Sequence, residues 1–312
     1  MASHLKNITF RQLRAFATTI KTGSLTAAAQ ELGVTQPAIS LQLQNLQDLA
    51  AMPILQRTPD GFVATEAGRE LLDLYGRFNL ALSDCMTALE TMRGATGGRV
   101  AVGAVSTSKY FVPAVMGAFS RANPGIELKL KIGNRAEIMA ALRDFSLDIA
   151  ITGRPLEDID LEKYRIGPHP HVIIAAPDHA MAARHRLQLA DLSAEIFITR
   201  EPGSGTRLLM ERLFEDAQIA PHLGMELDSN ETIKQAVMAG LGIAFISGHT
   251  VASEIQQGRL QALPVDGLPL LREWFVVRRA DRHMLPPAAR LMDFLSRESA
   301  AFLPQSGERP IR

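Results

Sequence analysis

The sequence is almost devoid of cysteine, since Cys85 is the only one among 312 residues. A single thiol cannot form an internal disulfide, and it cannot build a metal or iron–sulfur site that needs several cysteines. Small disulfide-stapled scaffolds are therefore excluded. The composition fits a reducing compartment, so we expect the protein in the cytoplasm.

Long apolar runs and an excess of charge of one sign are also missing. No stretch approaches the roughly eighteen consecutive apolar residues of a membrane span. The polar start MASHLKNITFRQ lacks the apolar core of a secretory signal, so we expect neither membrane insertion nor export. Lys plus Arg and Asp plus Glu each number 33, which gives a net charge of zero. Nucleic-acid binding depends on local charge, so this total leaves that function open.

The sequence does contain enough apolar residues for two domains, because 46% of it is hydrophobic and 21% is charged. Its first part has helical patterns, whereas after Arg99 short runs rich in Val and Ile alternate with helical patterns. Gly94, Gly97 and Gly98 favour a hinge between the two parts. We predict domains at residues 1–65, 66–93 and 94–312, the last with one lobe of about 99–170 and 270–302 and another of about 171–269.

The first part has the pattern of a helix-turn-helix. One helical pattern follows Thr9, and a second begins after Ser24 and stops at Gly33, a residue suited to a left-handed helix exit. A third begins with Thr35 as its cap and has Pro37 in its first turn. The short turn between the second and third helices predicts a helix-turn-helix.

The third helix presents a polar face that suits the major groove of DNA. Glutamine and asparagine can pair with adenine edges, serine can bind a base or a phosphate, and alanine and leucine can contact a thymine methyl group. The alternative is an ordinary solvated face, and the neighbouring turn and hairpin favour DNA binding. The predicted contact residues are Gln36, Pro37, Ala38, Ser40, Leu41, Gln44 and Asn45.

A hairpin follows and is predicted to form a wing. Residues 54–57 and 62–65 flank Thr58-Pro59-Asp60-Gly61, in which the Asp-Gly pair is a strong turn signal. Because the local positive charge is modest, we expect one copy to bind DNA weakly and dimerisation to supply affinity. Phosphate contacts are predicted for Arg57 beside the turn and for Arg11, Arg14 and Lys21 around the first helix.

A long helix is predicted after Thr65. Its apolar residues alternate steps of four and three over three heptads, as in a coiled coil. The alternative is a helix packed on its own domain, but a regular seam beside a small DNA-binding module favours pairing with a second copy. Cys85 lies on the seam and is interpreted as a packing residue. The predicted dimerisation residues are Leu71, Tyr75, Phe78, Leu82 and Leu89, with Met92 at the end of the seam.

From residue 99 onward, strands alternate with helices, which predicts a doubly wound α/β fold after an all-α-rich N-terminal module. Open α/β sheets bind ligands at the carboxyl ends of their strands. The expected strands are 100–105, 126–132, 147–152, 172–176, 196–199, 242–247 and 274–278, and the expected helices are 110–121, 136–143, 206–216, 233–239 and 287–299.

Three strand-end loops of this part carry hydroxyl groups, glycines and cations. Two of them precede helices, whose N-termini attract anions, and arginine can hold phosphate or carboxylate in a fork. Taken singly, each cation could instead form a surface salt bridge. Lys109, Arg154, Arg200 and Arg207 form the predicted cage for a small anion, together with Ser106, Thr107, Ser108, Gly153, Ser204, Gly205 and Thr206.

Catalytic interpretations have little support. His169, His171, His179 and His185 lack metal-ligand spacing on one helix and are predicted to be solvated loop residues. Ser204 lacks the full nucleophile-elbow pattern. We therefore predict no enzymatic activity, no metal and no cofactor.

The sequence resembles the LysR-type transcriptional regulators over its whole length. The resemblance implies a winged helix-turn-helix, a long dimerisation helix, a two-lobed effector domain like periplasmic binding proteins, and a homotetramer built as a dimer of dimers. It rests on Phe10-Arg11-Gln12-Leu13-Arg14-Ala15-Phe16, on residues 23–32, on Thr35-Gln36-Pro37-Ala38-Ile39-Ser40 and on Thr65-Glu66-Ala67-Gly68.

The second half is similar to regulators of Calvin-cycle RuBisCO operons, the CbbR type. This resemblance implies an activator of carbon-fixation genes, a phosphorylated metabolite as effector, and effector contacts from Asn230 and Glu231. A regulator of the same family that senses another carboxylate or an aromatic acid, or an α/β enzyme with an appended DNA-binding domain, remains an alternative. The similar segments are residues 105–111, 133–135, 153–155, 200–207 and 229–237.

Overall fold

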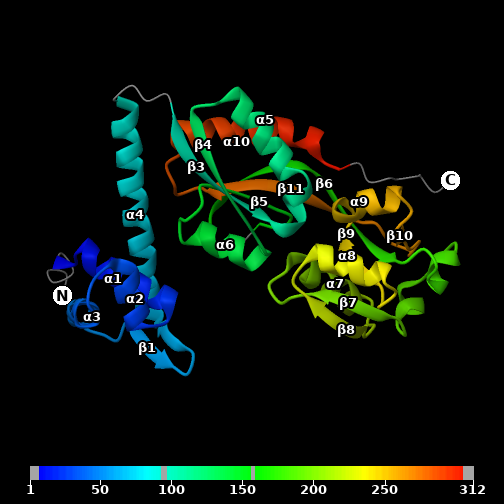
Figure 1. Cartoon of the computed structure of the whole chain (residues 1–312), viewed down its shortest axis with the longest axis horizontal. Coiled ribbons are helices and arrows are strands. Elements are labelled where there is room, and N and C mark those ends of the chain that lie inside the picture. Colours follow the sequence, from blue (N-terminus) through cyan, green and yellow to red (C-terminus); the bar gives the residue numbers. More distant parts are fainter. Residues whose placement is uncertain (1–6, 93–96, 156–158, 305–312) are drawn as a thin grey trace. The chain divides into compact units, whose positions relative to one another are not determined.

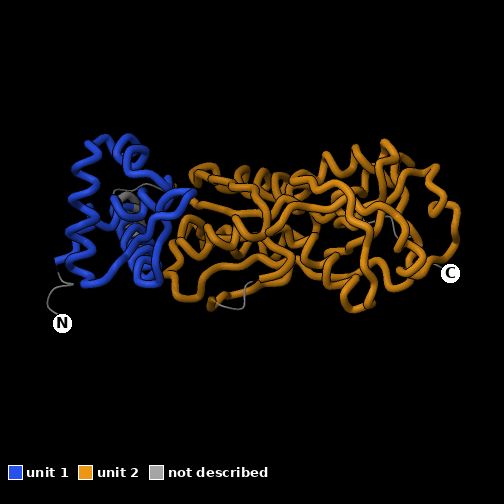
Figure 2. Tube along the Cα trace, turned by 90° about the horizontal axis from the view of Figure 1, so that it is seen from below, with its two compact units in different colours: residues 1–94 blue, residues 95–312 orange. Residues whose placement is uncertain are grey.

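The structure, a computed structural model, describes residues 7–92, 97–155 and 159–304. In the last two-thirds of the long helix, the side chains at positions 80, 83, 84, 87, 88 and 90–92 lie outside the description, Met92 among them. The chain divides into two compact units, Met1–Gly94 and Ala95–Arg312 (Figure 2). Residues 94–96 of the predicted hinge lie outside the described residues. Within the described ranges, no helix is both long enough and apolar enough to cross a membrane.

Unit 1 contains the predicted helices and hairpin (Figure 1). Its core is formed by apolar residues that recur at helical spacing, including the fully buried Leu13, Phe16 and Leu46. The elements are α1 (Phe10–Thr22), α2 (Leu25–Leu32), α3 (Gln36–Ala50), β1 (Leu55–Thr58), β2 (Gly61–Ala64) and α4 (Glu66–Met92).

The helix ends follow the sequence signals, with one exception. The Thr9 side chain accepts a hydrogen bond from the Gln12 backbone, and Gly33 ends α2 in the left-handed conformation. Thr35 stands at the N-cap of α3, but its side chain makes no capping hydrogen bond, so that part of the prediction is wrong. Pro37 lies in the first turn, where it removes no helical hydrogen bond.

The hairpin turn lies within the predicted segment, residues 58–61. Thr58 pairs with Gly61, so Pro59 and Asp60 are the two turn residues and Gly61 opens β2 with a φ of 122°. The backbone N–H of Phe62 donates to the carbonyl of Gly23 over 3.0 Å. A side chain at position 61 would collide with that carbonyl, and this close approach explains the glycine.

Unit 2 begins with a lobe built on parallel strands. Strand β3 (Gly98–Val105) pairs in parallel with β4 (Ile126–Gly133) and β5 (Ile149–Thr152), and β11 (Leu270–Arg279) pairs antiparallel to β5. Helices α5 (Val112–Ala122) and α10 (Pro286–Glu298) lie over one face of this sheet, and α6 (Arg135–Arg143) covers the other (Figure 1). We call this lobe I; its core includes Val102, Ile151 and Trp274.

The second lobe, lobe II, joins lobe I through β6 (Leu161–Ala175). This strand pairs with β11 and then, near its end, with β9 (Ala244–Ser247) and β10 (Gln261–Ala262). Its two apolar cores include Phe197, Phe214 and Phe245 in one and Ile233 and Ile246 in the other. The remaining elements are β7 (Ile196–Arg200), α7 (Gly205–Asp216), β8 (His222–Leu227), α8 (Asn230–Met238) and α9 (Gly248–Gln256).

Several elements of unit 2 differ from expectation. Strand β6 starts eleven residues before the predicted strand at 172. The sequence did not indicate this part of the strand, because Pro168 and Pro170 within a segment argue against a strand. Strand β8 is almost wholly exposed, so it carries no alternating apolar signal. Helix α9 was not predicted, and residues 106–110 form a short 3₁₀ helix ahead of α5, which starts at Val112 rather than at Tyr110.

Candidate functional site

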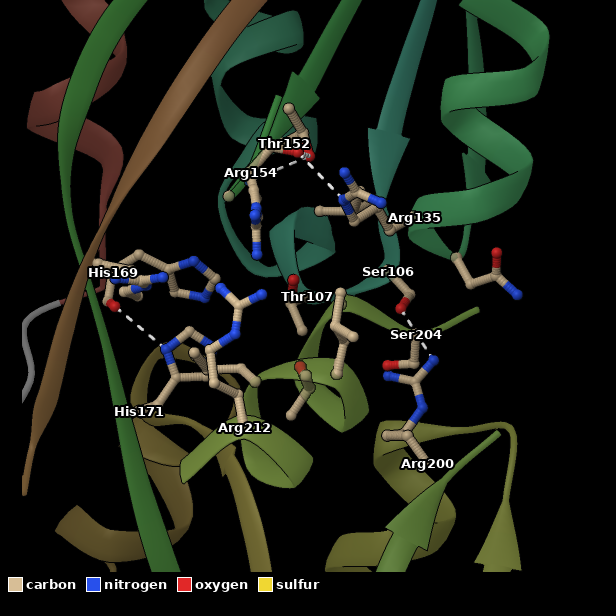
Figure 3. A pocket seen from close by; sticks show the side chains of 18 residues that line it. Ser106, Thr107, Arg135, Thr152, Arg154, His169, His171, Arg200, Ser204 and Arg212 are labelled. Atoms are coloured by element: carbon tan, nitrogen blue, oxygen red, sulfur yellow. Dashed lines mark hydrogen bonds between the residues drawn. The ribbon is translucent and has the colours of Figure 1, made fainter. Parts of the chain in front are cut away.

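A pocket in unit 2 lies where strands of both lobes reach their carboxyl ends (Figure 3). Val105 ends β3, Thr152 ends β5, and Arg200 ends β7. Such strand ends are where open α/β sheets place ligands. The pocket is lined by Val105, Ser106, Thr107, Asn134, Arg135, Thr152, Gly153, Arg154, His169, His171, Arg200, Ser204, Gly205, Thr206, Leu208, Leu209, Arg212 and Arg272.

Three residues in this lining are almost wholly buried, and their hydroxyl groups make no hydrogen bond within the described part of the chain. Thr107 is 6% exposed, and Ser204 and Thr206 are 5% exposed. Ser204 stands at the N-cap of α7, yet its side chain makes no capping bond. Buried polar groups are normally hydrogen-bonded, so these hydroxyls are available to a ligand.

Arg200 connects the two lobes at the pocket wall. Its guanidinium group donates to Glu201 over 2.7 and 2.9 Å, to the Asn230 side chain over 2.6 Å, and to the Ser106 hydroxyl over 3.2 Å. Ser106 belongs to lobe I, and the other three residues belong to lobe II. The charge of Arg200 is therefore neutralised locally, and its bond to Ser106 joins the lobes.

A second set of contacts joins the lobes beside the pocket. The Tyr110 hydroxyl donates to Glu231 over 2.5 Å, and the Lys109 ammonium group lies 3.4 Å from the same carboxylate. Burial, followed by the hydrogen bond to Glu231, raises the pKa of Tyr110 well above its usual value. Ser106, Tyr110, Arg200 and Glu231 together form what we call the interlobe clasp.

The structure brings together only part of the predicted anion cage. The predicted residues that do line the pocket are Ser106, Thr107, Gly153, Arg154, Arg200, Ser204, Gly205 and Thr206. Ser108 is fully buried, and its hydroxyl donates to the carbonyl of Val105. Glu231 belongs to the interlobe clasp, and Lys109 and Asn230 contact its members Glu231 and Arg200; none of these three residues lines the pocket.

Arg207 also lies outside the pocket lining, contrary to expectation. Its guanidinium group contacts Glu211, Glu226 and the carbonyl of Arg200. Helical spacing explains the error: Gly205, Leu208, Leu209 and Arg212 occupy one stripe of α7 that faces the pocket, and position 207 falls off that stripe. The same spacing could have identified Arg212 as the pocket-facing cation.

Other lining residues were missed because they are distant in sequence. Arg135 begins α6, and its Nε donates to the carbonyl of Arg154 over 3.1 Å. Arg272 pairs in register with His169 across β11 and β6, so both side chains lie on one face of the sheet. His169 and His171 alternate along β6 and share that face.

The prediction that these histidines are solvated loop residues is wrong for His169 and His171. Both are buried in β6, and the His169 ring stacks on Trp274 with centroids 3.8 Å apart. His179 caps a short 3₁₀ helix and lies 3.3 Å from Glu195, whereas His185 is exposed. In the described ranges no group of three or more His, Cys, Asp or Glu residues has metal-binding geometry.

Burial keeps the histidines beside the pocket neutral. Desolvation lowers the pKa of His171 to about 3 and that of His249 to about 4, and it also lowers the pKa of His169. His169 Nε2 contacts the Ser247 hydroxyl at 3.0 Å, and its Nδ1 has no partner in the described part of the chain. The positive charge of the pocket therefore comes from arginines.

These histidines should make the stability of unit 2 depend on pH. Their folded-state pKa values lie below the unfolded value of about 6.5, so the stabilisation is present above that pH and is lost as the pH falls toward 4. The free energy of unfolding should fall by up to about 1.4 kcal/mol per pH unit for His171. Urea unfolding at pH 7, 6 and 5, followed by the fluorescence of Trp274, measures this slope. A His171→Gln chain with an undiminished slope would contradict it.

Unit 1 presents the predicted DNA-contacting residues in different ways. Gln36, Pro37, Leu41, Gln44 and Asn45 are exposed on α3, and Ala38 and Ser40 are partly exposed, while Ile39, Leu43 and Leu46 are buried. Arg11, Arg14 and Arg57 are exposed. Lys21 instead pairs with Glu31 of α2 over 2.7 Å, which neutralises its charge.

The predicted seam on α4 changes character along the helix. Leu71 is 9% exposed and belongs to the core of unit 1, and Tyr75 packs beside Phe10 with ring centroids 5.5 Å apart. Phe78, Leu82 and Leu89 are 50%, 54% and 46% exposed, and Cys85 is exposed too. The part of the seam that a second copy could cover therefore starts at Phe78 rather than at Leu71.

Comparison with protein families gives two matches that together span most of the chain. Residues 10–69 match the bacterial regulatory helix-turn-helix proteins of the lysR family. Residues 93–300 match the LysR substrate binding domain.

Similar proteins carry related names. The regulator CbbR of Xanthobacter flavus is 47% identical over 95% of this chain and 90% of its own length. The RuBisCO operon transcriptional regulator of Allochromatium vinosum is 35% identical over 94% of this chain and 97% of its own length. The solved regulatory domain of CcmR from Synechocystis PCC6803, in complex with 2-PG, is 36% identical with a TM-score of 0.62, and the match covers 64% of this chain and 96% of that domain.

Proposed function

Because the chain belongs to the LysR family of bacterial transcriptional regulators, we propose that it binds operator DNA and controls RuBisCO operon genes in response to a small phosphorylated metabolite. The observation that carries the proposal is the pocket of unit 2. Its lining combines arginines of both lobes with hydroxyl groups of buried residues, and these hydroxyl groups have no partner in the described ranges. Such donors suit an anion with several acceptor oxygens.

The DNA-binding part of the proposal uses α3 as the recognition helix. Gln36, Ser40 and Gln44 recur at helical spacing on the side away from the core, so they can follow the floor of the major groove. Arg57 lies in the hairpin and would contact a phosphate group. Two copies joined through α4 would bind two half-sites, and the family resemblance extends this to a homotetramer of two such dimers.

The ligand would act by altering the balance between two arrangements of the lobes. Arg154 and Arg135 come from lobe I, and Arg212 comes from lobe II, so an anion between them favours the closed arrangement. Regulation of this kind needs no catalytic step and no cofactor, since binding energy alone shifts the equilibrium. The family also consists of transcriptional regulators, which supports a role without catalysis in the same cell compartment as the DNA.

Substitutions on α3 test the DNA-binding part. Gln36→Ala and Gln44→Ala should each weaken binding to the operator by about 1–3 kcal/mol where the side chain contacts a base. Arg57→Ala should weaken binding to all DNA to a similar degree, because phosphates carry no sequence information. Fluorescence anisotropy at fixed salt, with operator and scrambled DNA, separates the two effects.

A Gln257→Ala chain serves as the matched control, because this glutamine is exposed in unit 2. It should bind both DNAs like the unaltered protein. Unchanged operator selectivity in both the Gln36→Ala and Gln44→Ala chains would rule out α3 as the reading helix.

Ligand titration tests the effector part. Trp274 is the only tryptophan of the chain, and it stacks on a histidine that lines the pocket, so its fluorescence reports on pocket occupancy. Phosphate esters should bind and, at a hundred times their Kd, should stabilise unit 2 by about 2.7 kcal/mol. A panel in which only neutral or aromatic compounds bind would overturn the effector part and favour a regulator with another ligand.

A further inference from the structure

One ring nitrogen of a buried histidine in the pocket of unit 2, Nδ1 of His169, forms no hydrogen bond within the described part of the chain. We infer that this atom couples anion binding to the uptake of a proton. When an anion occupies the pocket, His169 takes up one proton from solvent on Nδ1 and donates a hydrogen bond from that atom to the anion. This inference rests on the proposed function, since it concerns the same pocket, but it holds for any anion whatever its carbon skeleton.

The free nitrogen of His169 faces a part of the pocket that only a glycine leaves open. A Cβ at position 153 would lie 2.7 Å from Nδ1, and Gly153 and His169 both line the pocket. The other ring nitrogen, Nε2, already contacts the Ser247 hydroxyl at 3.0 Å. Buried polar atoms normally have a partner, so a ligand of the pocket would complete the contacts of Nδ1.

Neighbouring rings hold His169 in this position. Its ring stacks on Trp274 with centroids 3.8 Å apart and planes 15° apart, and it packs against His171 with centroids 4.2 Å apart. Trp274 is itself fixed, because its Nε1 donates a hydrogen bond to His249 of α9 over 3.1 Å. Nδ1 is therefore presented to the pocket in one direction, so that little ordering is needed when a ligand binds.

The charges around His169 are positive or absent while the pocket is empty. Its titratable neighbours on β6 and α9 are His171 and His249, which burial keeps neutral. The lining contains no carboxylate among the described residues, and Glu273 of β11 lies on the opposite face of its strand and pairs with Arg165. The lining cations are Arg135 of α6, Arg154 after β5, Arg200 of β7, which Glu201 neutralises, Arg212 of α7 and Arg272 of β11.

An anion reverses the balance that keeps His169 neutral. Burial, followed by repulsion from the two other histidines, lowers the pKa of His169 in the empty pocket. A negative charge brought next to a buried group favours its positively charged form. Protonation also turns Nδ1 from an acceptor, which repels the oxygens of an anion, into a donor of a charge-assisted hydrogen bond. Anion and proton therefore stabilise each other in the pocket.

This coupling sets the direction of a pH dependence. Since the anion-bound protein holds one more proton than the empty protein, the Kd for the anion should decrease as the pH is lowered from 8 to 6. The limit for one proton is about tenfold per pH unit. The dependence ends at low pH, where His169 is protonated without an anion, and at high pH, where it stays neutral even with one.

Sulfate is the first probe, because it carries two negative charges throughout this range and has no proton of its own to lose. Titration of the full chain at pH 6, 7 and 8, in Tris and bis-Tris chloride at constant ionic strength, is followed by the fluorescence of Trp274. We expect the Kd for sulfate to be at least about tenfold lower at pH 6 than at pH 8. Ethyl phosphate is the second probe. Its own titration, with a pKa of about 6, is the same for every variant and cancels between them.

Substitutions assign the proton to one residue. His169→Asn keeps an amide donor near the place of Nδ1 but cannot titrate, so the change of Kd with pH should disappear. His169→Gln gives a second non-titrating chain if the unfolding midpoint shows that the first is not folded. His171→Asn should retain the pH dependence, because Nδ1 of His171 already contacts the carbonyl of His169 at 3.2 Å. The exposed His185 lies outside the pocket lining, so His185→Asn is the control and should retain the dependence too.

The outcomes separate this inference from the proposed function. A Kd for sulfate that stays constant from pH 8 to pH 6 in the unaltered protein would mean that the neutral ring moves its proton from Nε2 to Nδ1, and it would overturn proton uptake while leaving an anion-binding regulator. A dependence that survives without His169, or that disappears only in the His171→Asn chain, would overturn the assignment to His169.

If ethyl phosphate alone binds, its difference in pH dependence between the unaltered and His169→Asn chains decides in the same way. Failure of both probes to bind at every pH would overturn the anionic effector of the proposed function as well.

Discussion

A chain carrying both Phe78→Glu and Leu82→Glu is expected to be monomeric and to lose operator binding. The two apolar side chains are 50% and 54% exposed in the single chain and lie about one helical turn apart on α4. In a paired helix they would be buried against a second copy, and glutamates there would place like charges opposite one another in an apolar interface. Each monomer contacts only one half-site, so operator affinity should fall by a factor of about 100 or more. Analytical ultracentrifugation gives the mass, and anisotropy gives the DNA affinity.

Arg77→Glu is the matched control for this double substitution. It changes the net charge by the same two units on the same helix, but Arg77 is an exposed residue off the seam that pairs with Asp73 one turn away. The control should remain dimeric and bind operator, because exposed ion pairs of this kind contribute little. An unchanged mass for the folded double variant would instead show that this part of α4 does not form the dimer contact.

Arg200→Met is expected to destabilise unit 2 strongly and to abolish its response to the ligand. The Arg200 side chain is 2% exposed and bonds to Glu201, Asn230 and Ser106. Methionine fills similar space but leaves a partly buried carboxylate and a buried amide without their partner. Breaking a buried ion pair in this way costs about 3–5 kcal/mol. Loss of the bond to Ser106 also removes a link between the lobes at the pocket wall.

Urea unfolding followed by Trp274 fluorescence measures this loss. Arg186→Met provides the control, because Arg186 pairs with Asp266 over a similar distance of 2.7 Å but its side chain is 78% exposed. The control should shift the unfolding midpoint little, since water screens the exposed pair. Equal shifts for the two variants would show that the Arg200 network contributes no more than a surface ion pair.

The sequence predicted most elements of both units because their signals are local. Thr9, Ser24 and Gly33 set helix ends through contacts with residues at most five positions away, and the structure has the corresponding helices. Strands β3 and β5 are buried on both faces, so they appear as short apolar runs. The strand ends then located part of the pocket, since Ser106 and Gly153 directly follow β3 and β5, and Ser204 comes four residues after the end of β7.

The sequence could not predict contacts that depend on distant residues. Arg207 and Arg212 are both arginines of one helix, and only the packing of α7 against the pocket decides that Arg212 faces it while Arg207 pairs with Glu211 and Glu226. Likewise, the burial of His169 depends on Trp274, whose ring stacks on it. Trp274 lies more than a hundred positions later in the sequence, so no local pattern indicates this contact.

The sequence by itself thus determined the family, the winged helix-turn-helix and the strand-end location of the pocket, because these follow from residue order over short distances. Tertiary structure alone decided which cations line the pocket, which ones form the interlobe clasp, and where the exposed seam on α4 begins. The physical reason is that burial and ion pairing are set by neighbours in space: Leu71 is buried by α4 packing on its own unit, whereas Phe78, two turns further along the same apolar pattern, has no such neighbour in the described structure.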